Sequence, residues 1–429
     1  MIIDLIVIGF TLVGIRSILF TNNGLEKSLQ WIIFAFILGY RTFEPIPGLK
    51  LHPIEIFIYA SILRIIVTSP PKYSKIPVNI SILSIFFFTY FIIDCLTRYN
   101  KHVLFEFKNG ILLFIIFFVV QHIQIRKVYI IKLLKSYLFS ASTISTLGIL
   151  ELLFPSMVAA VFGYHNESAF FGESIFISRL AFLFWGSHLA ANLIPPIFPM
   201  LLLLKVERDP IANNNYFLTL LIIVNLFAIY LSGNRISWLI MTIFLIATTF
   251  QYKRSLLPKM KSYMLLVTIS FVAYIYSQPV EGRYISTFKA LTGQIDTRYD
   301  SSAGVRLVRA QIAIKSIVSD PLGTGWANQG WVHSDILQVA ASIGIIPGII
   351  FIIAPIILLI RIYRMYLTCN SEQKTLLFVF CCLLIFIIIS LSLNGNFFLV
   401  QCGVPLFLFW ALAFSYSEHY NNIGHGYSL

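Results

Sequence analysis

Residues 375–394 read TLLFVFCCLLIFIIISLSLN and contain no charged side chain. An α-helix needs roughly 20 apolar residues to cross a hydrocarbon core about 30 Å thick. The stretch does not alternate apolar and polar residues, as a strand of a membrane barrel would. It therefore predicts a transmembrane helix.

Runs of the same kind recur along nearly the whole chain. Of its 429 residues, 58% are hydrophobic and 11% are charged, whereas a soluble domain carries about 25% charged residues. Hydropathy predicts about 12–13 spans, placed near 2–20, 29–44, 53–68, 78–97, 109–123, 129–153, 178–204, 215–232, 236–251, 262–278, 335–360, 375–394 and 403–417. We expect one all-α, polytopic membrane domain over residues 1–429. Its first span should remain as a membrane helix, because it lacks the features of a cleaved signal peptide.

Basic residues in the short loops predict the orientation of these spans. Three basic groups, at 126–135, 253–261 and 361–374, are separated by even numbers of predicted spans and should therefore face the cytoplasm. The long segment 279–333 then faces the opposite, external side. The basic loop 98–108 also falls on the external side and is the exception to the rule.

The segment 279–333 is the longest polar stretch between predicted spans. Its part from Gly304 to Val318 has the periodicity of an amphipathic helix, with Ser301 and Ser302 as candidate N-caps. Asp320-Pro321 should end that helix, and a glycine-rich loop follows.

Five side chains at the predicted external surface are candidates for a binding or catalytic site: Arg179, Arg235, Arg283, Arg306 and His333. Guanidinium groups bind dianions such as pyrophosphate in a bidentate manner. Such a set suits a lipid-linked phosphate whose tail remains in the bilayer. Each arginine taken singly could equally reach lipid headgroups. His333 could be a polar helix cap or a general base near neutral pH.

Several other functions lack their motifs. The chain has no phosphate-binding glycine loop with lysine, no HExxH or cysteine/histidine metal spacing and no GxSxG elbow. Acidic residues are scarce within the spans, which disfavours a proton relay. We therefore expect no metal and no cofactor, and the net charge of +13 indicates membrane orientation rather than a nucleic acid partner.

One region resembles the signature of the bacterial O-antigen ligase and O-antigen polymerase superfamily. It comprises DPLGTGW at 320–326, HSDILQ at 333–338, and the glycines Gly344 and Gly348. The family joins a P-x-G-x-G turn to H-N-x-x-L and a glycine-containing helix, and Ser334 stands where it commonly has asparagine. The stretches that carry Arg179, Arg235 and Arg306 resemble the family's arginine positions, so the resemblance covers roughly 179–350.

The resemblance implies a membrane-embedded glycosyltransferase that needs neither metal nor nucleotide. Its donor would be a glycan on undecaprenyl diphosphate, and it would act at the periplasmic face of the bacterial inner membrane. Arg235 and Arg306 would hold the diphosphate, His333 would orient or deprotonate the acceptor hydroxyl, and Arg179 would support the site. Arg283 is a further candidate for substrate binding from its charge and its place in the long external segment, apart from the resemblance.

The acceptor is left open by the sequence. Polymerisation of lipid-linked repeat units is the preferred reaction, and ligation of the glycan to lipid A core is the alternative. A flippase or exporter of the same lipid is the alternative of another class. The expected partners are the lipid-linked glycan, the bilayer, and a chain-length regulator or other polysaccharide-assembly proteins.

Overall fold

The computed structural model describes residues 2–38, 43–46, 49–68, 111–112, 115–123, 125–154, 192–232, 234–251, 301–325, 332–393 and 400–426. Within these ranges the regular structure is helical except for one short antiparallel hairpin, formed by β1 (Phe43–Ile46) and β2 (Leu49–Leu51). The predicted helical class is confirmed there.

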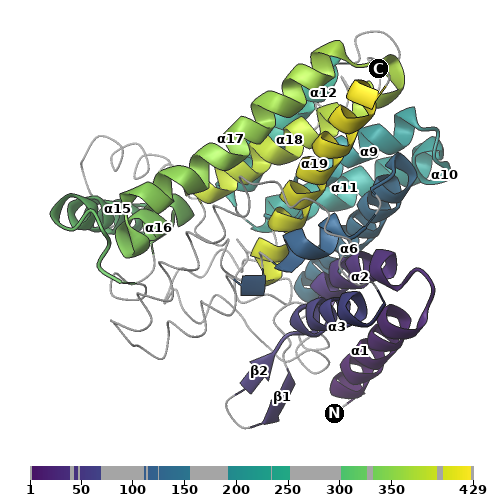
Figure 1. Ribbon diagram of the computed structural model, residues 1–429, viewed down its shortest axis with the longest axis horizontal. Helices are drawn as coiled ribbons and strands as arrows, with labels where there is room; N and C mark the ends of the chain where they lie inside the picture. The colour runs from purple at the N-terminus through teal and green to yellow at the C-terminus, as the bar shows by residue number, and fades with distance from the viewer. Residues whose placement is uncertain are drawn as a thin grey trace.

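The N-terminal part is a group of three mutually packed helices (Figure 1). These are α1 (Ile2–Phe20), α2 (Gly24–Phe34) and α3 (Pro53–Thr68). Each contributes one ring to an aromatic cluster, in which the centroid of Trp31 lies 5.0 Å from that of Phe10 and 5.9 Å from that of Phe57. Arg64 of α3 donates to the carbonyls of Leu19 and Thr21, which satisfies acceptors left over at the end of α1.

A long helix, α6 (Lys127–Leu153), connects this group to the middle of the molecule. It packs against α9 (Ile197–Val206) and α11 (Asn215–Ser232). Asn225 of α11 is fully buried, accepts from Ser145 Oγ at 2.7 Å and donates to Ser142 Oγ at 3.0 Å. Interhelical polar contacts of this kind contribute about 0.6 kcal/mol each in membrane proteins.

The C-terminal helices pack along one another in the upper half of Figure 1. They are α16 (Asp335–Ile343), α17 (Ile345–Thr368), α18 (Ser371–Leu393) and α19 (Val400–Gly426). One face of α17 carries exposed isoleucines, for example Ile346 at 58% and Ile357 at 60% exposure. α17 therefore presents a continuous apolar surface.

Three helices among the described residues are long and apolar enough to cross a membrane, judged by length and composition. They comprise Lys127–Leu150 of α6, all of α17, and Gln373–Leu393 of α18. Shorter apolar helices occupy Leu5–Phe20, Ile197–Val206, Asn215–Ile229 and Ile236–Thr248.

Several predicted spans match observed helices. The predicted 2–20, 53–68 and 215–232 coincide with α1, α3 and α11, and 375–394 corresponds to α18. The predicted spans 78–97 and 262–278 lie outside the described residues.

Three predicted spans are wrong as single helices. The predicted 335–360 is broken at Gly344 into α16 and α17, and α17 continues to Thr368. The described end of 178–204 is a turn followed by α9, because Pro195 and Pro196 provide no N–H for a helix that continues through them. The predicted 29–44 ends as α-helix at Phe34 and tightens into a 3-10 turn, η1 (Ala35–Leu38).

Candidate functional site

A glycine-containing turn closes onto the junction between α16 and α17, and we call the residues Pro321–Gly325 with Ala341–Ile345 the glycine clasp. The N–H of Thr324 donates to the carbonyl of Ala341 at 3.0 Å, and the N–H of Gly325 donates to that of Ser342 at 3.0 Å. The last carbonyls of a helix lack partners within the helix. The turn supplies those partners to α16.

In a third hydrogen bond of the clasp, the helix side donates and the turn accepts. The N–H of Ile345, the first residue of α17, donates to the carbonyl of Pro321 at 3.0 Å. Three glycines of the clasp have positive φ, +92° at Gly323, +98° at Gly325 and +117° at Gly344. A Cβ at Gly323 would lie 2.5 Å from the Ser342 carbonyl oxygen. Glycine is therefore required at this position both by conformation and by space.

His333 lies immediately before α16 and is half-buried. The following residue, Ser334, is the N-cap of α16, and its Oγ accepts from the N–H of Leu337 at 3.3 Å. The preceding residue, Val332, donates its N–H to Oε1 of Gln338 at 2.8 Å. The backbone is thus fixed on both sides of His333.

Arg306 lies in α15 (Ser301–Ser319), the predicted amphipathic helix, and is exposed. Ala313 and Ile317 of α15 pack against Val332, Leu337 and Ala341 around α16. Arg306 precedes Ala313 by seven residues, which is about two helical turns. It therefore lies on the α16-facing side of α15, as Ala313 does.

Ser301 and Ser302 are inside the first turn of α15 rather than before it. The prediction that they cap this helix from outside is wrong, because the helix begins at Ser301 itself. The predicted end of the helix before Asp320-Pro321 is confirmed.

Arg235 is the first residue of α12 (Arg235–Gln251), and its side chain lies outside the described part of the structure. Asn234 fixes the start of this helix, because its Oδ1 accepts from the N–H groups of Ile236 and Ser237 at 3.0 and 3.2 Å. Its Nδ2 donates to Oδ1 of buried Asn192 at 3.2 Å. A buried polar cluster therefore holds the backbone from which Arg235 extends.

The structure thus brings two of the five candidates, His333 and Arg306, to one packed pair of helices. α18 contacts both α12, which begins with Arg235, and α16, which follows His333. Arg179 and Arg283 lie outside the described residues.

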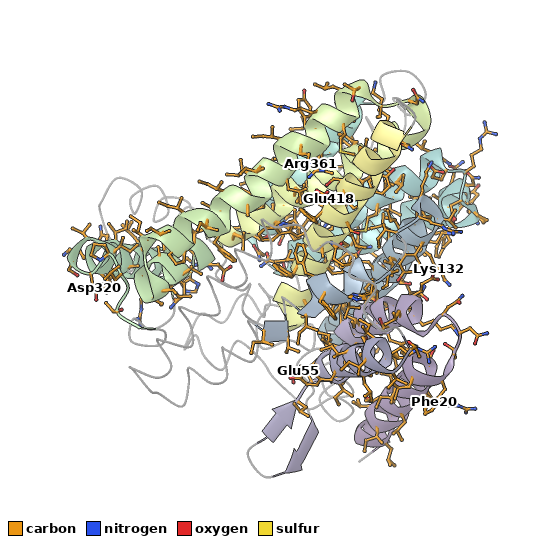
Figure 2. All side chains as sticks on the ribbon, in the orientation of Figure 1. Phe20, Glu55, Lys132, Asp320, Arg361 and Glu418 are labelled. Carbon is orange, nitrogen blue, oxygen red and sulfur yellow. The ribbon has the colours of Figure 1, made fainter. Side chains whose placement is uncertain are left out.

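Basic residues of α6 and α17 form ion pairs with acidic residues of other segments. Arg361 forms an ion pair with Glu418 of α19, and Figure 2 shows them well away from Asp320 in the clasp region. Lys127 pairs with Glu207 at 2.7 Å, and Lys135 pairs with Asp209, the N-cap of α10 (Pro210–Asn213). The Arg361 pair lies about 24 Å along the helix from Ile345 at 1.5 Å per residue.

Across the described ranges, no three His, Cys, Asp or Glu side chains gather as a possible metal site. The described cysteines Cys369, Cys381 and Cys382 are free and buried.

No family model matches the chain, and no curated protein matches it.

Sequence reasoning missed two residues of the site. Gln338 lies within the HSDILQ stretch, but nothing in its position along the sequence predicted that it would bond back to residue 332. Asn192 lies in a long apolar stretch, where a lone amide is itself a signal, because a buried polar group requires partners.

Proposed function

We propose that this chain is a membrane glycosyltransferase that polymerises oligosaccharide repeat units carried on undecaprenyl diphosphate. The observation that carries the proposal is the joint placement of His333 and Arg306. Arg306 lies on the α16-facing side of α15, and His333 immediately precedes α16. A base and an anion-binding group are the two parts that transfer from a diphosphate donor requires.

The chemistry assigned to these residues balances as a single displacement. The acceptor hydroxyl oxygen forms a bond to the anomeric carbon of the donor glycan, and the bond from that carbon to the diphosphate oxygen breaks. His333 takes the proton of the hydroxyl, while the diphosphate leaves with its negative charge held by Arg306 and Arg235. Arginine suits this role because its fork binds phosphate oxygens in pairs.

The membrane setting of the proposal is a bundle of about 12–13 spans in the bacterial inner membrane. The three long apolar helices and the exposed isoleucine face of α17 support a position in a bilayer. Arg361, one of the basic residues predicted to be cytoplasmic, pairs with Glu418 toward the opposite end of α17 from His333. The positive-inside rule predicts that basic residues at span ends lie on the cytoplasmic side, so in this proposal the His333 end is periplasmic.

The test is reconstitution of the purified protein in liposomes with a lipid-linked oligosaccharide. We expect products longer than one repeat unit on a gel, and loss of these products in His333→Ala. His122→Ala is the matched control, because His122 lies in another part of the chain and its Nδ1 is 2.8 Å from the Phe118 carbonyl.

Two other outcomes correspond to the alternative functions. Transfer only when lipid A core is added would indicate a ligase. Movement of intact lipid-linked sugar across the bilayer with no new glycosidic bond would indicate a flippase and contradict the enzyme proposal.

A further inference from the structure

The side chain of Gln338 links the backbone before His333 to the glycine clasp. Its Oε1 accepts from the N–H of Val332 at 2.8 Å, and its Nε2 donates to Oγ of Ser342 at 3.2 Å. Ser342 is fully buried, and its carbonyl accepts the N–H of Gly325 in the clasp. One amide group therefore bonds both to the residue before His333 and to a residue in the last turn of α16.

The second fixed point lies on the other side of His333. Ser334 caps α16 through the N–H of Leu337. Gln338 holds the N–H of Val332, and the cap holds the side chain of Ser334. Both chain neighbours of His333 are therefore held by hydrogen bonds to α16 or its cap.

We propose that Gln338 is a positioning residue for His333. Through Val332 it fixes the position of the imidazole relative to the acceptor hydroxyl, and through Ser342 it ties that position to the clasp. The inference rests on the proposed glycosyltransferase function and adds a residue to its site. A purely structural role for Gln338, as a brace within α16, would affect stability and leave the chemical step unchanged.

Three variants in the liposome assay separate these roles. Gln338→Leu removes both hydrogen bonds and leaves a side chain of similar size. Gln338→Glu keeps an acceptor for the Val332 N–H, and the Ser342 hydroxyl can donate to its second oxygen. Gln311→Leu makes the same exchange at an exposed glutamine of α15 and is the matched control.

We expect Gln338→Leu to lower kcat about 10- to 100-fold, because a misplacement near 1 Å costs that much in a positioned site. KM for the lipid-linked donor should stay unchanged, because Arg306 lies on α15 and is untouched. Gln338→Glu should restore most of the turnover, and Gln311→Leu should match the wild-type protein.

A second readout does not require activity. Diethyl pyrocarbonate modifies exposed imidazoles, and mass spectrometry gives the rate at His333 relative to His122 in the same protein. We expect this ratio to change in Gln338→Leu, to return toward the wild-type value in Gln338→Glu, and to stay constant in Gln311→Leu.

The turnover measurement and the labelling ratio can contradict the proposal independently of each other. Wild-type turnover in Gln338→Leu would overturn the positioning role while leaving the proposed function in place. If the wild-type protein forms no glycosidic bond, the proposed function fails. The labelling ratio alone then tests whether Gln338 positions His333. An unchanged ratio in Gln338→Leu would then overturn the claim that this side chain holds His333.

Discussion

At the scale of single residues, Gly323 is the position most tightly constrained by its surroundings. Its φ is +92°, and a Cβ there would lie 2.5 Å from the Ser342 carbonyl oxygen. Gly323→Ala should therefore lower the free energy of unfolding by at least about 1–3 kcal/mol, measured by thermal unfolding in detergent. Gly9→Ala in α1 is the control, because nothing lies within 4 Å of its added Cβ. Equal stability of the two variants would contradict the observed clasp.

Arg306 and Lys315 offer a matched pair of charges on one helix. Both are exposed on α15, but they are nine residues apart, about two and a half turns, and so lie on opposite sides of the helix. Arg306→Ala should lower polymer formation about 100- to 1000-fold, as for loss of one group that stabilises developing charge. Lys315→Ala should leave it unchanged.

Replacement of Arg306 by lysine sharpens this comparison. Lysine keeps the charge but lacks the bidentate fork, so it should rescue poorly. The measurement is the rate of polymer formation from lipid-linked oligosaccharide. Full activity of Arg306→Ala would remove this residue from the site.

At the scale of elements, two helix caps can be compared directly. Asn234 caps α12 from a buried position and also bonds to Asn192, whereas exposed Asn214 caps the start of α11 through the N–H groups of Tyr216 and Phe217. Either change to alanine removes a cap, which costs about 1 kcal/mol. Asn234→Ala should cost about 0.5–1.5 kcal/mol more, because its buried hydrogen bond to Asn192 is lost while Asn192 keeps Ser237 as a partner. Equal losses in chemical unfolding would show that the buried cluster adds nothing.

The helices were predictable where apolar runs end at clear polar boundaries. α1, α3 and α11 have the predicted bounds for this reason. The break at Gly344 was not predicted from hydropathy, because apolar residues continue on both sides. Gly344 ends α16 with a positive φ, as glycine often does at a helix C-terminus, and the N–H of Ile345 bonds to the Pro321 carbonyl. Hydropathy indicates which residues avoid water. It does not indicate where one helix ends and the next begins within an apolar stretch.

The sequence proposes the residue types of the candidate site but not its geometry. His333 and Arg306 were identified from the motif and from charge placement, and the structure brings their elements together. Gln338 could not be assigned a role from the sequence, because its partner at residue 332 is reached by a side chain folding back along its own helix. Contacts of this kind depend on rotamers that sequence patterns do not specify.

At the scale of the whole molecule, the proposed orientation can be tested by labelling from one side. Lys315→Cys on α15 and Asn370→Cys between α17 and α18 are exposed positions near opposite ends of α17. With the five native cysteines replaced by alanine, a membrane-impermeant maleimide should label the first in cells with a permeabilised outer membrane and the second only after lysis. Labelling of both from one side would contradict a bilayer position between them.

The glycine clasp has one more consequence, which concerns inheritance rather than stability. The hydrogen bonds that hold the histidine segment all arise between Pro321 and Ile345, from one short piece of chain folded back on itself. Such a piece is contiguous in the gene, so it is inherited as a unit, and its packing against α17 and α18 is what a related chain would have to match. Recombination outside this segment would then leave the clasp and the proposed catalytic histidine together.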